Sequence, residues 1–382
     1  MDFINILSNG ELINCGMFGC AYKFQMNNKF YCIKFNFRKE KINYNEIYTM
    51  NLKNINTIPK KYIYHHYDAE IKIQKLLNKI EGEDINHKKL PFTIKIYNNG
   101  KIINKKIINK IKDIIYKNFI NKNNKKTFIN EFISHINNCN IIYYNIMDYK
   151  QNILLSNFLY DDIGNVKLKF NQIKELHTYF FYIIYYLYLI NNVYTFLHGD
   201  LHSSNIILVN DEEYENNKLK YRIIKMNNNY YKIQIFKYRP YIIDFGLSSI
   251  FNKNIINQNI IYYNNFFYNN CKIINKSIIL NKNKFLLYDL FIELSNIYCV
   301  IKYNQINNYI YYCHYNKLKI LEILFNYKKE SIKTMNLILK KVNQRDDIKK
   351  GCNFNFLVYY YSRLTNKSIY NFIKPFQIYN KK

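Results

Sequence analysis

The stretch Phe196-Leu-His-Gly-Asp-Leu-His-Ser-Ser-Asn-Ile-Ile-Leu208 joins a polar loop to an apolar strand. Within the loop, Asp200 and Asn205 stand five residues apart, directly before the apolar run. This spacing places a carboxylate and an amide over one cleft, where the carboxylate can accept a proton from a hydroxyl group. The segment therefore predicts a site that combines proton transfer with oxygen ligands.

A second stretch supplies another acidic group. Tyr241-Ile-Ile-Asp-Phe-Gly246 predicts a buried strand that ends in the carboxylate of Asp244, with Gly246 allowing the backbone to turn. The carboxylate of Asp244 and the side-chain carbonyl of Asn205 are hard oxygen ligands. Such a pair suits Mg²⁺ that is bound largely through nucleotide phosphates.

The chain has only nine glycines, and four of them (Gly16, Gly19, Gly199 and Gly246) lie beside groups that a phosphate site would need. Gly16 and Gly19 border a turn between two expected strands, where backbone amides can approach a polyphosphate closely. Lys34 ends the next alternating run, and an ammonium on a rigid strand can neutralise phosphate oxygens. Each feature alone is ordinary, so only their combination is informative.

The hydrophobic pattern divides the chain into a strand-rich front third and a helix-rich remainder, which indicates an α+β arrangement of two lobes. The expected elements are three strands in 11–36, a helix at 68–80 capped by Asp68, strands at 92–97 and 140–149, a solvated insertion with some helix at 98–130, and helices at 170–197, 284–301 and 316–325.

Taken in order, these segments resemble the signature elements of the protein-kinase superfamily. Gly16 and Gly19 match two glycines of its nucleotide loop, and Lys34 matches its strand lysine. The further matches are Glu70 in the helix-C segment Glu70-Ile-Lys-Ile-Gln-Lys-Leu76, the segment Leu90–Tyr97, the hinge Met147-Asp148-Tyr149, the catalytic loop His198–Asn205, the triplet Asp244-Phe-Gly246, and Asp289 in the central C-lobe helix. The resemblance spans roughly residues 10–300, and the ordered set is far more specific than any one motif.

The resemblance implies a bilobal, protein-kinase-like α+β fold, with a small antiparallel β-rich N-lobe and a larger, mainly helical C-lobe. The implied N-lobe is residues 1–148, with an insertion at about 98–130. The implied C-lobe is residues 149–382, with an insertion at about 211–238. Residues 302–382 are expected to form amphipathic helices that complete this lobe.

The resemblance also implies a serine/threonine protein kinase that transfers the γ-phosphoryl group of ATP, with Mg²⁺ or Mn²⁺, to protein hydroxyls. The implied catalytic residues are Asp200, Lys34, Glu70 and His202; the implied nucleotide contacts are Asn14, Gly16, Phe18, Gly19, Lys34, Met147 and Asp148; the implied metal ligands are Asn205 and Asp244. In this interpretation Asp200 orients the Ser or Thr hydroxyl, while His202 lies near the moving phosphoryl group.

Several positions depart from the family pattern. Asn14 replaces the first loop glycine, Gly199 replaces the arginine that pairs with a phosphorylated activation loop, and His202 replaces the usual lysine. No A-P-E triplet follows Asp244. With these departures, the sequence resembles the divergent kinases of large cytoplasmic DNA viruses, of which the poxvirus type is the best-known example. Haspin-like kinases share part of the pattern too, as do aminoglycoside- and choline-kinase-like enzymes. A small-molecule kinase and a pseudokinase or basic scaffold therefore stay open as alternatives.

The composition narrows the class of partners. The formal charge is +29, yet only five of the 56 basic residues are arginines, and the abundant Asn, Ile, Lys, Tyr and Phe share A/T-rich codons. Because arginine is the residue that makes bidentate contacts with phosphate and guanine, we expect no dedicated nucleic-acid site. Non-specific attraction to polyanions is expected instead.

Cysteine usage and hydropathy indicate a cytoplasmic protein, in the host cytoplasm and the virion if it is viral. The eight cysteines show no C-x-x-C pair and no zinc spacing, so reduced thiols are expected. The first residues lack the basic start of a signal peptide. The uncharged run 178–197 contains six tyrosines, which favours a buried helix over a transmembrane segment.

Overall fold

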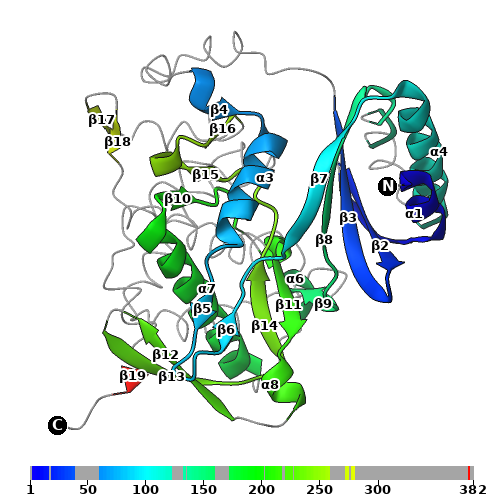
Figure 1. The fold of residues 1–382 in the computed structure, drawn as a ribbon. Helices are drawn as coiled ribbons and strands as arrows, with labels where there is room; N and C mark the ends of the chain where they lie inside the picture. Colours follow the sequence, from blue (N-terminus) through cyan, green and yellow to red (C-terminus); the bar gives the residue numbers. More distant parts are fainter. Residues whose placement is uncertain are drawn as a thin grey trace, which may run out of the picture.

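The computed structural model describes residues 2–16, 19–38, 60–122, 132–134, 136–159, 172–201, 203–216, 220–226 and 228–258, with three short strands at 272–274, 277–279 and 377–378. These residues form an antiparallel sheet with two helices on one side and a second part built around a long helix (Figure 1). Each part has its own cluster of buried hydrophobic residues. The α+β class predicted from the sequence is therefore confirmed.

The front part is a five-stranded antiparallel sheet with the strand order β1-β2-β3-β8-β7. Its strands are β1 (Glu11–Gly16), β2 (Gly19–Met26), β3 (Lys29–Arg38), β7 (Ile96–Ile102) and β8 (Ile141–Asp148). Along β3, the side chains of Ile33, Phe35 and Phe37 are fully buried, and helices α1 (Phe3–Asn9) and α4 (Lys105–Lys122) pack over them. Because side chains alternate along a strand, Cys32 and Lys34 belong to the opposite face.

Helix α4 lies in the region predicted to be a solvated insertion. Its residues Ile108, Ile111 and Ile115 are buried at helical spacing in the same cluster as the sheet. The prediction of some helix in this segment is confirmed, and the helix is not merely solvated, because one of its faces is part of the core. The basic composition of the segment concealed one apolar stripe, which is enough to cover a sheet face.

The β1–β2 turn is set by a close backbone approach and by a covalent link. A Cβ atom added at Gly19 would lie 2.1 Å from the carbonyl oxygen of Phe35, so β2 can approach β3 here only without a side chain. Cys15 and Cys20 are opposite each other in the hairpin and form a disulfide. The expectation of reduced thiols is wrong for this pair, because the two residues become neighbours only when the hairpin closes.

Helix α3 (His66–Leu77) follows the short elements η2 (Lys60–Tyr62) and β4 (Ile63–Tyr64). Its N-cap is His65, whose Nδ1 accepts a hydrogen bond from the backbone N–H of Tyr67 at 3.4 Å. The predicted cap, Asp68, lies within the first turn, because the helix begins two residues earlier than the hydrophobic periodicity suggested.

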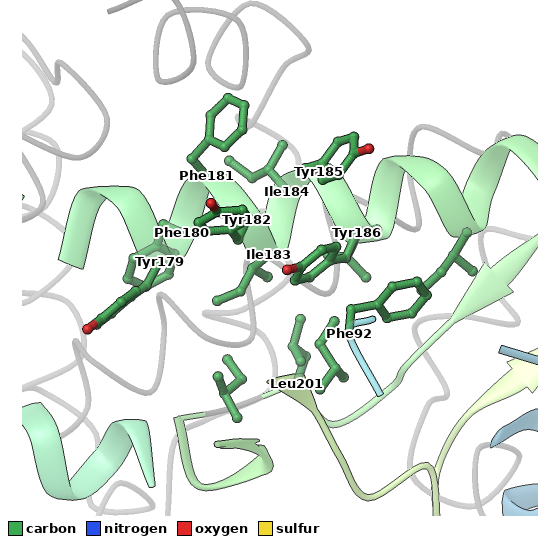
Figure 2. Packing of buried hydrophobic residues seen from close by; sticks show 14 of the residues in the cluster. Phe92, Tyr179, Phe180, Phe181, Tyr182, Ile183, Ile184, Tyr185, Tyr186 and Leu201 are labelled. Atoms are coloured by element: carbon green, nitrogen blue, oxygen red, sulfur yellow. The ribbon is translucent and has the colours of Figure 1, made fainter. Parts of the chain in front are cut away.

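Helix α7 (Ile173–Val193) is the central helix of the second part, and every residue from Tyr179 to Leu187 is buried. Phe181 and Tyr185 point to one side of the helix, whereas Tyr186 points toward Phe92 and Leu201 on the other (Figure 2). This all-round burial agrees with the predicted buried helix. No helix among the described residues is long and apolar enough to cross a bilayer. The predicted helix extends to residue 197, but the chain leaves the helix at Val193.

A three-stranded antiparallel sheet, with the order β14-β11-β9, carries the loops that contain the candidate functional residues. Its strands are β9 (Asn152–Leu154), β11 (Ile206–Asn210) and β14 (Tyr238–Ile242). The segment between β11 and β14 forms a hairpin of β12 (Tyr221–Met226) and β13 (Asn229–Gln234), against which β19 (Gln377–Ile378) pairs. The inner side chains of the hairpin, including Ile224 and Tyr231, join the core around α7.

The remaining described elements are short. They are β5 (Gly82–Glu83), β6 (Lys89–Leu90), α6 (Leu155–Leu159), β10 (Phe196–Leu197), η4 (Ser203–Asn205), α8 (Glu212–Glu215), β15 (Ser249–Ile250), η5 (Phe251–Lys253), β16 (Ile256–Asn257), β17 (Lys272–Ile274) and β18 (Ser277–Ile279). The helices predicted at 284–301 and 316–325, with Asp289, lie outside the described residues.

Candidate active site

The central feature of the candidate site is the side chain of Lys34 on β3. Its Nζ lies 2.8 Å from Oε1 of Glu70 on α3 and 3.6 Å from Oδ1 of Asp244, which follows β14. Three elements that are far apart in the sequence therefore meet at one ammonium group. Glu70 is almost fully buried, whereas 46% of the Asp244 side chain is exposed.

Burial and the ion pairs together shift the pKa values of all three groups. Burial alone would lower the pKa of Lys34, but the carboxylates of Asp244 and Glu70 raise it above its usual value. Lys34 in turn holds the pKa of Asp244 below its ordinary range. Burial raises the pKa of Glu70, although Lys34 acts in the opposite direction. Lys34 and Asp244 are thus charged at neutral pH.

The backbone at Asp244 has an unusual conformation. Its φ angle is 59°, in the left-handed region that few residues other than glycine adopt. The N–H of Gly246 donates a hydrogen bond of 3.3 Å to Oδ1 of Asp244. Such a conformation persists only where its surroundings hold it, and it is typical of functional turns. The sequence predicted a turn here but not this strain.

The loop after β10 brings Asp200 and Asn205 close together. Nδ2 of Asn205 donates to the carbonyl oxygen of Asp200 at 2.8 Å and to its carboxylate Oδ2 at 3.3 Å. The backbone carbonyl of Asn205 accepts a hydrogen bond of 3.0 Å from the N–H of Ile243, the residue before Asp244. The side chain of Asn205 therefore contacts Asp200, and its backbone contacts the residue that precedes Asp244.

His198 connects the same loop to the strand before Asp244. Its Nε2 lies 3.1 Å from the carbonyl oxygen of Ile243, and its Nδ1 accepts a 3.3 Å hydrogen bond from the N–H of Asp200. Gly199, between them, has a φ of 82°, which explains a glycine at this position. The loop geometry is thus fixed by side-chain to backbone hydrogen bonds.

The donor set around Asp244 fits a magnesium ion. Asp244 has an ionised and partly exposed carboxylate, and Asn205, whose Nδ2 is bound to Asp200, is the second residue whose side-chain oxygen could bind the ion. No group of three or more His, Cys, Asp or Glu side chains in the described residues could hold a metal by itself. Magnesium that keeps waters and phosphate oxygens needs only one or two carboxylates, so a pair of oxygen ligands is sufficient.

An apolar surface lies on the same side of the sheet as Lys34. The register pairs Ala21 with Lys34, and it pairs Cys32 with Met147, so these side chains share one face. Met147 packs against a small cluster that includes Ile207 of β11 and, less buried, Ile243. Burial raises the pKa of the Cys32 thiol to about 12, so this side chain stays neutral. The alternation of β2 and β3 in the sequence is consistent with this placement, but Ala21, Cys32 and Ile207 were not predicted to lie near Lys34.

The remaining predicted contacts are placed less favourably or are not described. Asp148 directs its carboxylate to Lys29 at 2.8 Å and accepts a hydrogen bond from the hydroxyl of Tyr97 at 2.7 Å. Its backbone N–H donates to the carbonyl of Lys95 at 3.0 Å. The side chain of Asp148 thus belongs to a surface cluster. Asn14 is exposed near the end of β1.

Gly16 ends β1 opposite Gly19, as expected for the predicted glycine turn. Two other predicted site residues, Phe18 and His202, lie outside the described residues.

Comparisons with known proteins add little. No known family model matches the chain, and no curated protein matches it. Among solved structures, the chain is similar to a double-mutant form of the PknI kinase domain of Mycobacterium tuberculosis, with 10% sequence identity and a TM-score of 0.28. The match covers 62% of this chain and 57% of that kinase domain. A TM-score of this size is too low to establish a common fold.

Proposed function

We propose that this chain is an ATP-dependent phosphotransferase, and specifically a protein serine/threonine kinase. The observation that carries the proposal is the position of Lys34 between Glu70 and Asp244, at 2.8 and 3.6 Å. A phosphoryl-transfer site needs a fixed cation for the phosphates and a carboxylate that can bind a metal ion, and catalysis is then mostly positioning and charge neutralisation.

In this proposal the residues of the chain divide the work. Glu70 orients Lys34, whose ammonium binds phosphate oxygens, and the face that contains Ala21 and Cys32 accepts the flat apolar base. Mg²⁺ held by Asp244 and Asn205 would neutralise the charge of the outer phosphates. Asp200 accepts the proton of the attacking hydroxyl, which requires an ionised carboxylate.

The protein substrate and the viral relationship rest on the catalytic-loop pattern alone. His198-Gly-Asp-Leu-His-Ser-Ser-Asn205 resembles the loops of divergent viral serine/threonine kinases, and also those of small-molecule kinases. The acceptor must therefore be decided by experiment.

The test is a phosphoryl-transfer assay on the full chain with Mg²⁺ and radiolabelled ATP, using a casein-like protein, an aminoglycoside and choline as separate acceptors. We expect label on the protein, and we expect Asp200→Asn to reduce the rate by orders of magnitude, because an amide cannot accept the hydroxyl proton as the Asp200 carboxylate does. The matched control is Asp113→Asn, an exposed aspartate on α4, which should leave the rate unchanged.

Three outcomes would overturn the proposal in different ways. Label on choline or the aminoglycoside but not on protein identifies a small-molecule kinase. No transfer to any acceptor, with nucleotide binding retained, identifies a pseudokinase or scaffold. A wild-type rate in Asp200→Asn refutes the assignment of that residue.

A further inference from the structure

The segment that follows Asp244 returns to the start of helix α3. Strand β16 pairs in parallel with β4, with Ile256 opposite Ile63 and Asn257 opposite Tyr64. Strand β4 leads into α3, the helix that carries Glu70, and Figure 1 shows β4 and β16 side by side near the start of that helix. The pairing thus connects the two acidic partners of Lys34 through the backbone.

The side chain of Asn257 makes a second connection. It is fully buried, and its Nδ2 donates a 2.7 Å hydrogen bond to the carbonyl oxygen of Gly246. Its backbone N–H donates to Oγ of Ser249 at 3.0 Å. The N–H of the same Gly246 donates to Oδ1 of Asp244, so the turn is held from both sides.

We propose that Asn257 is a positioning residue, which holds the Asp244 turn and helix α3 in the arrangement where Lys34 contacts both carboxylates. The inference rests on the proposed function, since it concerns the same site. Asn257 acts on Asp244 through Gly246, and on Glu70 through the pairing of β16 with β4. It touches neither the nucleotide nor the metal ion in this proposal.

The strain at Asp244 gives the physical reason for such a residue. A left-handed φ in a residue other than glycine costs free energy, and the surrounding structure must compensate for it. The buried amide of Asn257 can compensate for this cost, because it donates a hydrogen bond to the carbonyl of Gly246, two residues after Asp244. Loss of that hydrogen bond would leave a polar group unsatisfied, which is unfavourable.

The experiment compares Asn257→Ala and Asn257→Leu with a matched control, Asn191→Ala. Asn191 is also buried, and its Nδ2 donates to a backbone carbonyl, that of Leu187 at 2.9 Å, but within α7. The Leu variant keeps most of the side-chain volume and removes the amide group, including the Nδ2 donor. Binding of Mg·ADP and of metal-free ADP is measured by calorimetry, and hydrogen exchange is measured by mass spectrometry of the unliganded full chain.

We expect both Asn257 variants to weaken Mg·ADP binding about tenfold, the size of one lost hydrogen bond, with a smaller change for metal-free ADP. Exchange should accelerate in peptides that cover residues 63–70 and in those that cover 244–250. The Asn191→Ala variant should change neither the affinity nor the exchange in these two segments, although it also loses stability.

Each alternative result has a distinct meaning. Faster exchange at 244–250 alone, without a change at 63–70, would refute the connection to helix α3. Equal effects of Asn191→Ala and Asn257→Ala on Mg·ADP affinity would reduce Asn257 to a stability residue. If the wild-type chain binds no Mg·ADP, the proposed function fails, and the exchange data still decide whether Asn257 couples the two segments.

Discussion

The ion pairs around Lys34 and those around Asp211 differ in charge balance and in access to water. Around Lys34, one ammonium faces the two carboxylates of Glu70 and Asp244. Around Asp211, the guanidinium groups of Arg222 and Arg239 converge, and Arg222 also lies 3.7 Å from Asp84. Two arginines therefore face two aspartates.

The Asp211 cluster is closed. Arg222 donates two hydrogen bonds of 3.2 Å to the two carboxylate oxygens of Asp211, and a third of 2.6 Å to the hydroxyl of Tyr182. Arg239 donates to the carbonyl of Pro91 at 2.7 Å and to the hydroxyl of Tyr186 at 3.2 Å. None of the four charged side chains is more than 11% exposed. This cluster fastens the residues around β12 and β14 to helix α7.

The Lys34 cluster is open. It carries one cation for two carboxylates, and nearly half of the Asp244 side chain is exposed. A buried network that serves only the fold is expected to balance its charges, because an unpaired buried charge is costly. A network with a surplus carboxylate at the surface is suited to bind a further cation. The comparison therefore supports the proposed site at Lys34 and a purely structural role for the Asp211 cluster.

The largest expected effect is on phosphoryl transfer by Asp244→Asn. Asparagine tolerates a left-handed φ, so the turn at 59° can persist while the negative charge is lost. We expect the rate with Mg·ATP to fall by roughly three orders of magnitude or more, since charge neutralisation supplies most of the catalysis. The rate is measured with saturating ATP, and the melting temperature is measured in parallel.

The melting temperature should fall only slightly, because the Asp244 side chain is half exposed and water screens its favourable pairing with Lys34. A variant that unfolds, or one that transfers phosphate at the wild-type rate, would contradict the division into an open site and a closed scaffold.

The next effect is on stability, from Asp211→Asn. This change leaves two buried guanidinium groups with too little negative charge, and breaking a buried pair from one side costs about 3–5 kcal/mol. We expect that loss in the free energy of unfolding, measured by urea titration at low temperature. Per folded molecule, phosphoryl transfer should stay within about twofold of wild type.

The control for Asp211→Asn is Glu212→Gln, the adjacent exposed carboxylate, which should change stability by less than about 0.5 kcal/mol. A selective loss of phosphoryl transfer in Asp211→Asn, with stability unchanged, would mean that the closed cluster is functional after all.

Local patterns in the sequence were sufficient for much of the fold. The alternation in residues 11–36 predicted β1, β2 and β3 because each strand keeps its apolar side chains on one buried face. The spacing of Asp200 and Asn205, with Asp244 after an apolar strand, predicted the polar residues that the structure brings together. Their catalytic and metal-binding roles stay predictions.

The features that escaped prediction depend on contacts between distant segments. Strands β4 and β16 have two residues each and are almost two hundred residues apart, so no periodicity marks them. The Asp211 cluster joins side chains from several elements and has no local signature. The disulfide of Cys15 and Cys20 depends on the register of a hairpin rather than on a motif. In each case the tertiary fold, and not the local sequence, determines which residues come into contact.

The smallest expected effect is the pH dependence of stability in Lys34→Met. At neutral pH this variant leaves Glu70 buried without its hydrogen-bonded cation, so we expect it to be less stable than wild type by about 1–3 kcal/mol. Burial already raises the pKa of Glu70, and removal of Lys34 raises it further. Below that raised pKa the variant protonates Glu70 and loses less stability, so the difference in the free energy of unfolding from wild type should narrow as the pH falls from neutrality towards the ordinary range of a glutamate. Urea titrations at several pH values measure the gap.

The matched control is Lys23→Met on β2. Lys23 and Lys34 are equally exposed, at 25%, but the partner of Lys23 is Glu11, which is 67% exposed and 3.6 Å away. Because water screens that pair, its loss should cost less than about 1 kcal/mol at every pH in this range. A gap in Lys34→Met that stays constant with pH would show that Glu70 does not depend on Lys34 for its charge. The open cluster would then be no more than a surface ion pair, and the contrast with the Asp211 cluster would be lost.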